Sequence, residues 1–320
     1  MGLPLIVLYI SFFGLIFLLN WGCVVYLAPW VMGLEQWLED RLQGKPTTPI
    51  HFRRLTYFNT SNSHPPQSKI VSTSSLSFLP VLALSIAFLL AAITPAFASG
   101  LCSGFGIDNF FLIIYLLLTL PFFMLLSGYG KPAFIDIRTL QFFLFDNILF
   151  LPTLFVVGII LKLTTNEVSL GKIVVFFHSS NPFPMMAYCP LLTSAFVVLL
   201  MTWNVLDFKD RVNTIKILKT SDKLLYLYAY DIQFLVMLSL ISLFIWPNSL
   251  IYFDTSHINI VTTLCALPFA VLAWIAKIVF TCVILAIFRS IYLLTANAYK
   301  ARLAFIVSIV SIITYFTGLK

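Results

Sequence analysis

Long apolar segments alternate with short polar segments along this chain, and eight of the apolar segments are long enough to span a bilayer. An α-helix needs about 20 consecutive apolar residues to cross roughly 30 Å of hydrocarbon. The segments cover residues 3–26, 76–97, 109–129, 142–161, 185–205, 224–246, 261–288 and 303–319. No soluble domain fits between them. The pattern therefore predicts an all-α fold, a polytopic membrane helical bundle with about eight transmembrane helices, in which residues 1–320 form a single integral membrane domain.

The composition agrees with this prediction. Of the 320 residues, 60% are hydrophobic and 10% are charged, and the mean hydropathy is +1.00, which is too apolar for a soluble domain of this size. The formal net charge is +7, but the basic residues lie in short connections between apolar segments, so we expect membrane lipid and no nucleic acid as a partner. The five cysteines are scattered without a CxxC pair. We therefore expect them to be packing residues and predict no metal site.

The basic residues also predict the orientation of the chain. Of the 19 Lys and Arg residues, 15 lie in the first, third, fifth and seventh connections, and only three lie on the opposite side. Cytoplasmic loops carry an excess of Lys and Arg. The odd-numbered connections are therefore predicted to be cytoplasmic and both termini to lie outside the cytoplasm, as in a multi-pass protein of the cell inner membrane.

The first cytoplasmic loop, residues 31–75, is the longest and begins with an amphipathic pattern. Apolar and aromatic residues recur at helical spacing between Trp30 and Leu42, beside the carboxylates of Glu35 and Glu39. This pattern predicts an amphipathic helix that lies on the cytoplasmic face. Such a helix could anchor the loop at the membrane surface or form a platform for a cytoplasmic partner, and both interpretations remain open.

Three ionisable residues interrupt the predicted spans, namely Asp146, Asp231 and Lys277. At 1.5 Å per residue they lie about 6, 10 and 16 Å from the cytoplasmic ends of their helices. A charge at the centre of a membrane helix costs about 3 kcal/mol or more, so each side chain should face the bundle interior or water. Two interpretations follow. The residues could line a water-containing half-channel for protons, or they could form interhelical ion pairs that hold the bundle together.

Prolines interrupt the spans as well. Pro121, Pro152 and Pro268 lie within predicted spans. Each proline removes one backbone hydrogen bond and exposes the carbonyl four residues back. The sequence contains no His-rich ligand set, no Ser-His-Asp grouping and no Gly-rich phosphate loop, so we expect no catalytic centre in this chain.

Four segments carry a resemblance to a known family. The segment "DRLQGKPTTP" follows the first span, and "FLPVLALSIAFLLAAITPAF" forms the second. The segment "RTLQFFLFDNILFLPTLFVVGIIL" opens the fourth span, and "YLYAYDIQFLVMLSLISLFIWP" forms the sixth. In this order they resemble the quinone-module membrane subunit of respiratory complex I, known as subunit 1 or H. They also resemble its relatives in membrane-bound hydrogenases, such as formate hydrogenlyase subunit 4 and hydrogenase-4 component C.

The resemblance implies a non-catalytic membrane subunit of a complex I-like or hydrogenase-4-like assembly. Such a subunit couples a cytoplasmic redox module to proton or sodium translocation, within an oxidoreductase complex of the NADH:quinone or hydrogenase type. The implied proton path runs through Asp136, Asp146, Asp231 and Lys277. The implied contacts to the partner or quinone module are Arg41, Gln43, Lys45 and Arg138.

The resemblance also implies the partners of the chain. They would be antiporter-like membrane subunits and a soluble cytoplasmic subunit, with quinone at the cytoplasmic interface and no cofactor held by the chain itself. The fifth connection departs from the family pattern, because it is net basic where the relatives are rich in Glu and Asp. Two other functions stay open, namely a stand-alone secondary transporter that uses the three intramembrane charges as its site, and a structural scaffold that has lost proton chemistry.

Overall fold

The structure is a computed structural model that describes residues 3–46, 78–99, 108–128, 153–163, 165–179, 192–203, 220–245, 250–252, 260–291 and 297–318. Nearly all of these residues are helical. The helices are α1 (Leu3–Leu42), α3 (Leu79–Ile93), α4 (Phe110–Gly128), α6 (Leu170–Ser179), α8 (Thr220–Ile245), α9 (Ile260–Ile291) and α10 (Asn297–Gly318), together with the apolar helical segments Thr153–Leu163 and Leu192–Trp203. Two short strands, β1 (Ala98–Ser99) and β2 (Ile251–Tyr252), pair in parallel. The part of the chain that the structure describes is therefore all-α, as the apolar pattern predicts.

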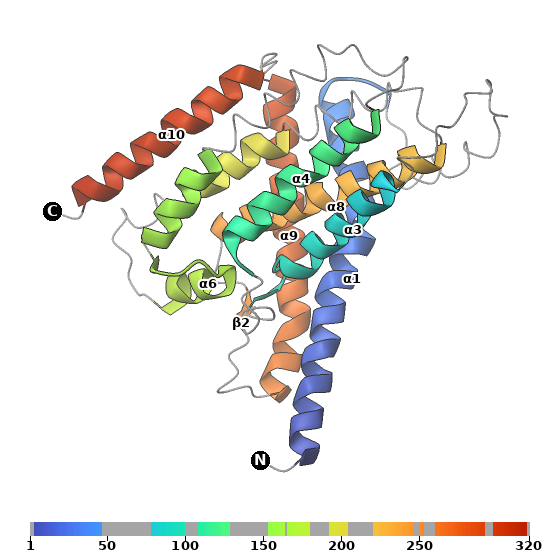
Figure 1. Cartoon of the computed structure of the whole chain (residues 1–320), viewed down its shortest axis with the longest axis vertical. Helices are drawn as coiled ribbons and strands as arrows, with labels where there is room; N and C mark the ends of the chain where they lie inside the picture. Colours follow the sequence, from blue (N-terminus) through green and yellow to red (C-terminus); the bar gives the residue numbers. More distant parts are fainter. Residues whose placement is uncertain are drawn as a thin grey trace.

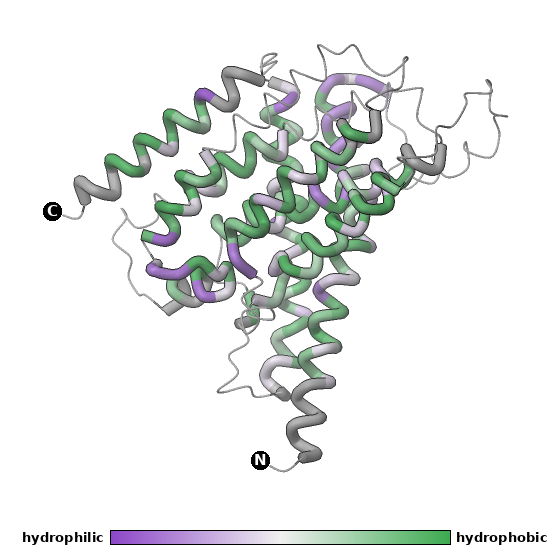
Figure 2. The backbone as a smooth tube through the Cα atoms, in the orientation of Figure 1, coloured by the Kyte–Doolittle hydropathy of each residue, from purple (hydrophilic) through white to green (hydrophobic). Residues whose placement is uncertain are grey.

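Membrane-spanning length is reached by three helices within the described residues. The segments Ser11–Leu42, Leu224–Ile245 and Thr262–Ser290 are long and apolar enough to cross a bilayer. Four shorter apolar helices, Leu79–Ile93, Phe110–Leu120, Thr153–Leu163 and Leu192–Trp203, coincide with other predicted spans. Figure 2 shows that hydrophobic residues make up most of the described length of the helices. The helices thus support a membrane protein, and the number of eight spans stays a prediction.

Helix α8 forms the centre of the described bundle. It packs against α1, α3, α4 and α9, and almost every residue between its first and last turns is buried. Helices α1 and α9 lie side by side, and their lower halves extend beyond the layer formed by α3, α4 and α8 (Figure 1). In the view of Figure 1, α1 and α9 run upward, α4 runs obliquely upward, and α3 and α8 run obliquely downward across them. Odd- and even-numbered spans alternate in this way, whereas the orientation of the bundle relative to the cytoplasm stays a prediction.

The first helix differs from the expectation of a span followed by a separate surface helix. Helix α1 continues through Pro29 to Leu42 as one element of 40 residues. Pro29 has no N–H to donate to the carbonyl of Val25, four residues back. The hydroxyl of Tyr228 in α8 donates to that carbonyl instead, with an O–O distance of 3.1 Å. Because α8 supplies the missing donor, α1 does not have to end at the proline.

Helix α4 shows the same arrangement. Residue 121 is a proline, so the carbonyl of Leu117 loses its intrahelical donor. The side-chain amide of Gln233 in α8 donates to this carbonyl at 3.0 Å. Pro121 therefore leaves the carbonyl of Leu117 without an intrahelical donor, as expected, and the buried side chain of Gln233 in α8 supplies the hydrogen bond instead. Pro268 lies inside α9, and Pro152 lies outside the described residues.

Helix α3 (Leu79–Ile93) ends inside the second predicted span, which covers residues 76–97. Pro95 disfavours the helical conformation for the residue before it, and Thr94 adopts an extended backbone with ψ of 124°. The side chain of Asn20 in α1 then binds the non-helical chain. Its amide donates to the carbonyl of Thr94 at 3.2 Å, and its oxygen accepts from the N–H of Ala96 at 3.1 Å. β1 follows directly and pairs with β2, which lies beyond the end of α8. The pattern of apolar residues does not predict this pairing.

A glycine brings the helical segment Thr153–Leu163 close to α4. A Cβ atom added at Gly158 would lie 2.6 Å from the ring of Phe111. Small residues allow such close approach between membrane helices. The helical segment Thr153–Leu163 therefore packs on α4 at Gly158, where any larger residue would require the ring of Phe111 to move.

We predict that the Tyr228 hydroxyl stabilises the bundle only because Pro29 frees the carbonyl of Val25. Tyr228→Phe removes the donor, and the buried carbonyl should cost about 1–2 kcal/mol of stability. Pro29→Ala restores an intrahelical N–H, so Tyr228→Phe should cost little in that background. Thermal unfolding of the four variants in detergent measures this coupling.

Tyr115→Phe serves as the matched control, because Tyr115 is an exposed tyrosine of α4 and its change should leave the melting temperature unaltered. If Tyr228→Phe lowered the melting temperature equally with Pro29 and with Ala at residue 29, the hydroxyl would stabilise the bundle by some other contact.

Candidate functional site

A nearly buried ion-pair cluster joins the ends of α1 and α9. The guanidinium Nη1 of Arg289 lies 3.0 Å from Oε1 of Glu35 and 2.8 Å from Oε2 of Glu39. The side chains of Glu35, Arg289 and Glu39 are 0%, 7% and 18% exposed. Arg289 also lies in the last turn of α9, where a cation interacts favourably with the helix C-terminus. Buried charges persist only when they are paired in this way, so the cluster joins the two helix ends at the predicted cytoplasmic side.

The amphipathic pattern of residues 30–42 predicts that Glu35 and Glu39 lie on the polar face of a surface helix, whereas in the structure both carboxylates face Arg289 of α9. The spacing of residues contains the signal for this placement. The two carboxylates continue, at steps of three and four residues, the buried stripe of α1 formed by Val24, Ala28 and Met32. A stripe at this spacing faces one neighbour. A basic residue at the end of the seventh span could then have been recognised as the partner.

The end of α1 is set by a glycine. Gly44 has a φ of +67°, a conformation that glycine adopts without strain. The N–H of Gly44 donates to the carbonyl of Arg41 at 3.2 Å, and the N–H of Lys45 donates to that of Asp40 at 2.9 Å. This pair of hydrogen bonds is the Schellman arrangement that terminates helices. The segment "DRLQGKPTTP", the first of the four that resemble the known family, therefore contains the C-terminus of α1 and its cap.

The residues of this segment that were expected to contact a partner lie at the surface. The guanidinium of Arg41 lies over the ring of Trp37, 4.9 Å from its centroid. The side-chain amide of Gln43 donates to Oε1 of Glu39 at 2.9 Å, so Gln43 extends the ion-pair cluster toward solvent. Lys45 is exposed. These positions are accessible to another molecule, and their expected role stays a prediction.

Two of the predicted intramembrane charges lie on α8 and α9, which pack against each other. Asp231 is buried in α8, one turn beyond Tyr228, and Lys277 is half-buried in α9. The indole N–H of Trp274 in α9 donates to the hydroxyl of Ser239 in α8 at 3.2 Å. Along α8, Asp231 lies about 12 Å from Ser239, toward the predicted cytoplasmic end of that helix. Along α9, Lys277 lies about 4.5 Å from Trp274, also toward the predicted cytoplasmic end. The depth of both residues in a bilayer and their role in a proton path stay predictions.

The remaining predicted site residues cannot be placed in this geometry. Asp136, Arg138 and Asp146 lie outside the described residues. Within the described ranges, no group of three or more His, Cys, Asp or Glu side chains could hold a metal ion. Beside the cluster at the ends of α1 and α9 and the separate charges of Asp231 and Lys277, the described residues contain a third polar network.

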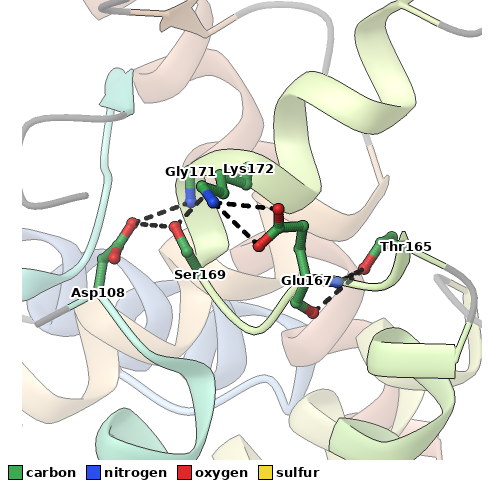
Figure 3. A network of polar contacts seen from close by, with 6 residues as sticks. All are labelled: Asp108, Thr165, Glu167, Ser169, Gly171 and Lys172. Carbon is green, nitrogen blue, oxygen red and sulfur yellow. Dashed lines mark hydrogen bonds and ion pairs between the residues drawn. The ribbon is translucent and has the colours of Figure 1, made fainter. Parts of the chain in front are cut away.

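The third network surrounds the start of α6, where α4 also begins (Figure 3). The carboxylate of Asp108 accepts hydrogen bonds from the hydroxyl of Ser169 and from the N–H of Gly171, the latter at 3.2 Å. Lys172 and Glu167 form an ion pair at 3.0 Å beside it. A carboxylate at a helix N-terminus satisfies otherwise free N–H groups and the helix dipole. Asp108 therefore holds α6 against α4, and this structural role accounts for its burial.

Together these helices define a class of protein, an all-α membrane bundle in which buried side chains such as Asn20, Gln233 and Arg289 bind groups on other helices or segments. The fold is similar to that of a membrane subunit in the structure of the membrane-bound sulfane sulfur reductase (MBS), an archaeal respiratory membrane complex. The similarity has a TM-score of 0.62 at 16% sequence identity, and it covers 94% of this chain and 99% of that chain. No protein-family model and no curated protein matches the sequence. At this identity the similarity shows a shared fold, over essentially the whole length of both chains.

We predict that Arg289 is the residue on which the ion-pair cluster depends. Arg289→Gln leaves two carboxylates facing each other in a nearly buried site, and removing one partner of a buried ion pair costs about 3–5 kcal/mol. The variant should therefore melt at a clearly lower temperature in detergent. Exchanging both Glu35 and Arg289 for Met should recover part of this loss, because apolar replacements of a buried pair are tolerated.

Arg302→Gln is the control, since Arg302 is an exposed arginine of α10 and its change should leave the melting temperature unaltered. An Arg289→Gln variant as stable as the parent chain would mean that the cluster does not hold α1 to α9.

Proposed function

We propose that this chain is a non-catalytic membrane subunit of a complex I-like or hydrogenase-4-like respiratory assembly. In this role it couples a cytoplasmic redox module to proton or sodium translocation. The observation that carries the proposal is the fold, which is shared over 94% of the chain with a membrane subunit of an archaeal respiratory membrane complex. The four short segments that resemble the complex I subunit 1 family support it independently.

In this proposal the proton path runs through Asp136, Asp146, Asp231 and Lys277. The burial of Asp231 supports it, because the residue is 1% exposed on the most enclosed helix of the described bundle. An ionisable residue in the interior of a membrane protein is costly and is commonly part of an ion pathway. The neighbouring polar residues of α8, Tyr228 and Gln233, satisfy backbone carbonyls of α1 and α4.

The partners in this proposal are antiporter-like membrane subunits and a soluble cytoplasmic subunit. Gln43, Lys45 and Arg138 would contact the soluble subunit or a quinone at its interface, in an inner membrane protein with both termini outside. The exposure of Gln43 and Lys45 just beyond the end of α1 supports this placement. Purification of the tagged chain in mild detergent, with identification of the co-migrating proteins, tests it. A chain that migrates alone and transports ions by itself would instead be a stand-alone transporter.

We predict that Asp231→Asn abolishes most ion translocation while the assembly stays intact. The amide keeps the size and hydrogen bonding of the carboxylate but cannot take up a proton, and loss of a positioned proton-transfer group lowers rates by about 100-fold or more. Asp146→Asn should have the same effect, and Asp146→Glu, which matches the family, should restore much of the activity. Ion uptake by vesicles that contain the whole purified assembly measures these rates.

Asp108→Asn provides a matched control, because Asp108 is also a buried aspartate but only holds α6 against α4. Its translocation should equal that of the parent assembly. Normal translocation by the Asp231→Asn assembly would remove Asp231 from the proton path.

A further inference from the structure

One face of α1 points away from the bundle along most of the helix and changes its chemistry in a regular order. Its residues recur at steps of four, seven, four, seven and four positions, which keeps them on one side of an α-helix. They are Leu15, Leu19, Tyr26, Trp30, Trp37 and Arg41. We call this set the outer stripe of α1. Tyr26 is 68% and Trp30 45% exposed, and Glu35 on the opposite face is buried.

The order along the outer stripe is aliphatic, then aromatic, then cationic. A bilayer changes in the same order from hydrocarbon to interface to headgroup, and Tyr and Trp are enriched at the interface. Arginine side chains commonly extend from the edge of the hydrocarbon toward the phosphates. The outer stripe therefore has the chemistry of a helix face that passes out of a bilayer into its headgroup layer.

The neighbouring helix shows how far the apolar surface reaches. Ile287 and Phe288 in α9 are exposed and apolar, and the next residue, Arg289, is paired with Glu35 and Glu39 of α1. The apolar outer surface of α9 therefore extends to the level of Glu35 to Glu39. Trp37 lies between these two carboxylates in sequence, so it lies where the apolar surface ends.

We infer that Trp37 and Arg41 form a binding site for the phosphate of an anionic phospholipid, with Tyr26 and Trp30 in the adjacent bilayer interface. The ring of Trp37 holds the guanidinium of Arg41 at 4.9 Å from its centroid, which orients it for the bidentate contact that guanidinium makes with phosphate. Glu35 and Glu39 do not neutralise Arg41, because they are turned toward Arg289 on the other side of α1. Exposed Lys45 adds a second positive charge one turn beyond.

This site differs from the partner contact that the family resemblance implies for Arg41, and it does not depend on the proposed function. A face that docks another protein does not require a change from aliphatic residues at Leu15 and Leu19 to aromatic and cationic residues at Trp37 and Arg41. A lipid surface does, because it presents the same progression at every point around the helix.

The first test compares lipid binding of the full chain in nanodiscs of phosphatidylcholine with and without phosphatidylglycerol. Phosphatidylglycerol should raise the melting temperature of the parent chain and remain bound to it in native mass spectrometry. Arg41→Gln should weaken this binding by about fivefold, the effect of one basic residue at an anionic membrane surface. Trp37→Leu should weaken it as well, and Trp37→Phe should retain most of it.

Two controls make the result specific. Arg302→Gln removes the same charge from an exposed position on α10, where no aromatic ring of the described residues stacks on the guanidinium, and it should weaken phosphatidylglycerol binding less than Arg41→Gln does. All variants should melt alike in phosphatidylcholine alone, which shows that they are folded. If Arg41→Gln and Arg302→Gln weakened binding equally, or if neither weakened it, the lipid site would be wrong.

The second test distinguishes lipid from protein at the same face. A photoreactive phenylalanine derivative replaces Trp30, and the chain is illuminated in native membranes. We expect adducts with the mass of a phospholipid. Adducts with another protein would overturn the inference and make the outer stripe of α1 a subunit contact.

Discussion

Backbone carbonyl groups that lose their intrahelical donor inside the bundle must find another donor there, and the rest of the described structure depends on this constraint. In a bilayer there is no water to satisfy them, and each unsatisfied group costs several kcal/mol. Prolines at residues 29 and 121 create two such carbonyls, in α1 and in α4, and α8 satisfies both with Tyr228 and Gln233. α8 is therefore the central helix because of its polar side chains as much as its apolar ones. Its position between α1 and α4 follows from the donors that it supplies.

The same constraint explains the other buried polar contacts. The side chain of Asn20 satisfies the chain where α3 stops short, and Asp108 satisfies the first N–H groups of α6. Arg289 provides the charge that two carboxylates of α1 require. Each of these contacts joins segments far apart in the sequence, so each specifies which helices are neighbours. Apolar packing alone would not do so, because lipid tails are as apolar as the side chains they would replace.

The sequence predicts those parts of this structure that depend on one helix at a time. Apolar runs of about 20 residues predict where α4, α8 and α9 lie, because span length is set by the bilayer and not by the neighbouring helices. The helix break at Pro95, inside the second predicted span, was not predicted, because the side chain that satisfies it, Asn20, lies 74 positions away from Thr94 in sequence. The burial of Glu35 was missed for the same reason. Its charge suggested solvent, and only the position of Arg289 at the end of α9 shows that it faces inward. Pairing between distant segments cannot be read from the hydropathy of either one.

The position of Asp231 has a consequence for the proposed coupling. The residue lies on the helix that is held most firmly, by hydrogen bonds to the backbone of α1 and α4 and by the Trp274–Ser239 contact with α9. Moving α8 as a body would leave the carbonyls of Val25 and Leu117 without donors, at a cost of about 1–2 kcal/mol for each. In the proposed function, a proton must therefore pass Asp231 by rearrangement of side chains and water around a stationary helix. Any movement that couples the redox module to translocation would therefore belong to segments that do not carry these hydrogen bonds. The carbonyls that Pro29 and Pro121 leave without an intrahelical donor hold α8 in place within the bundle.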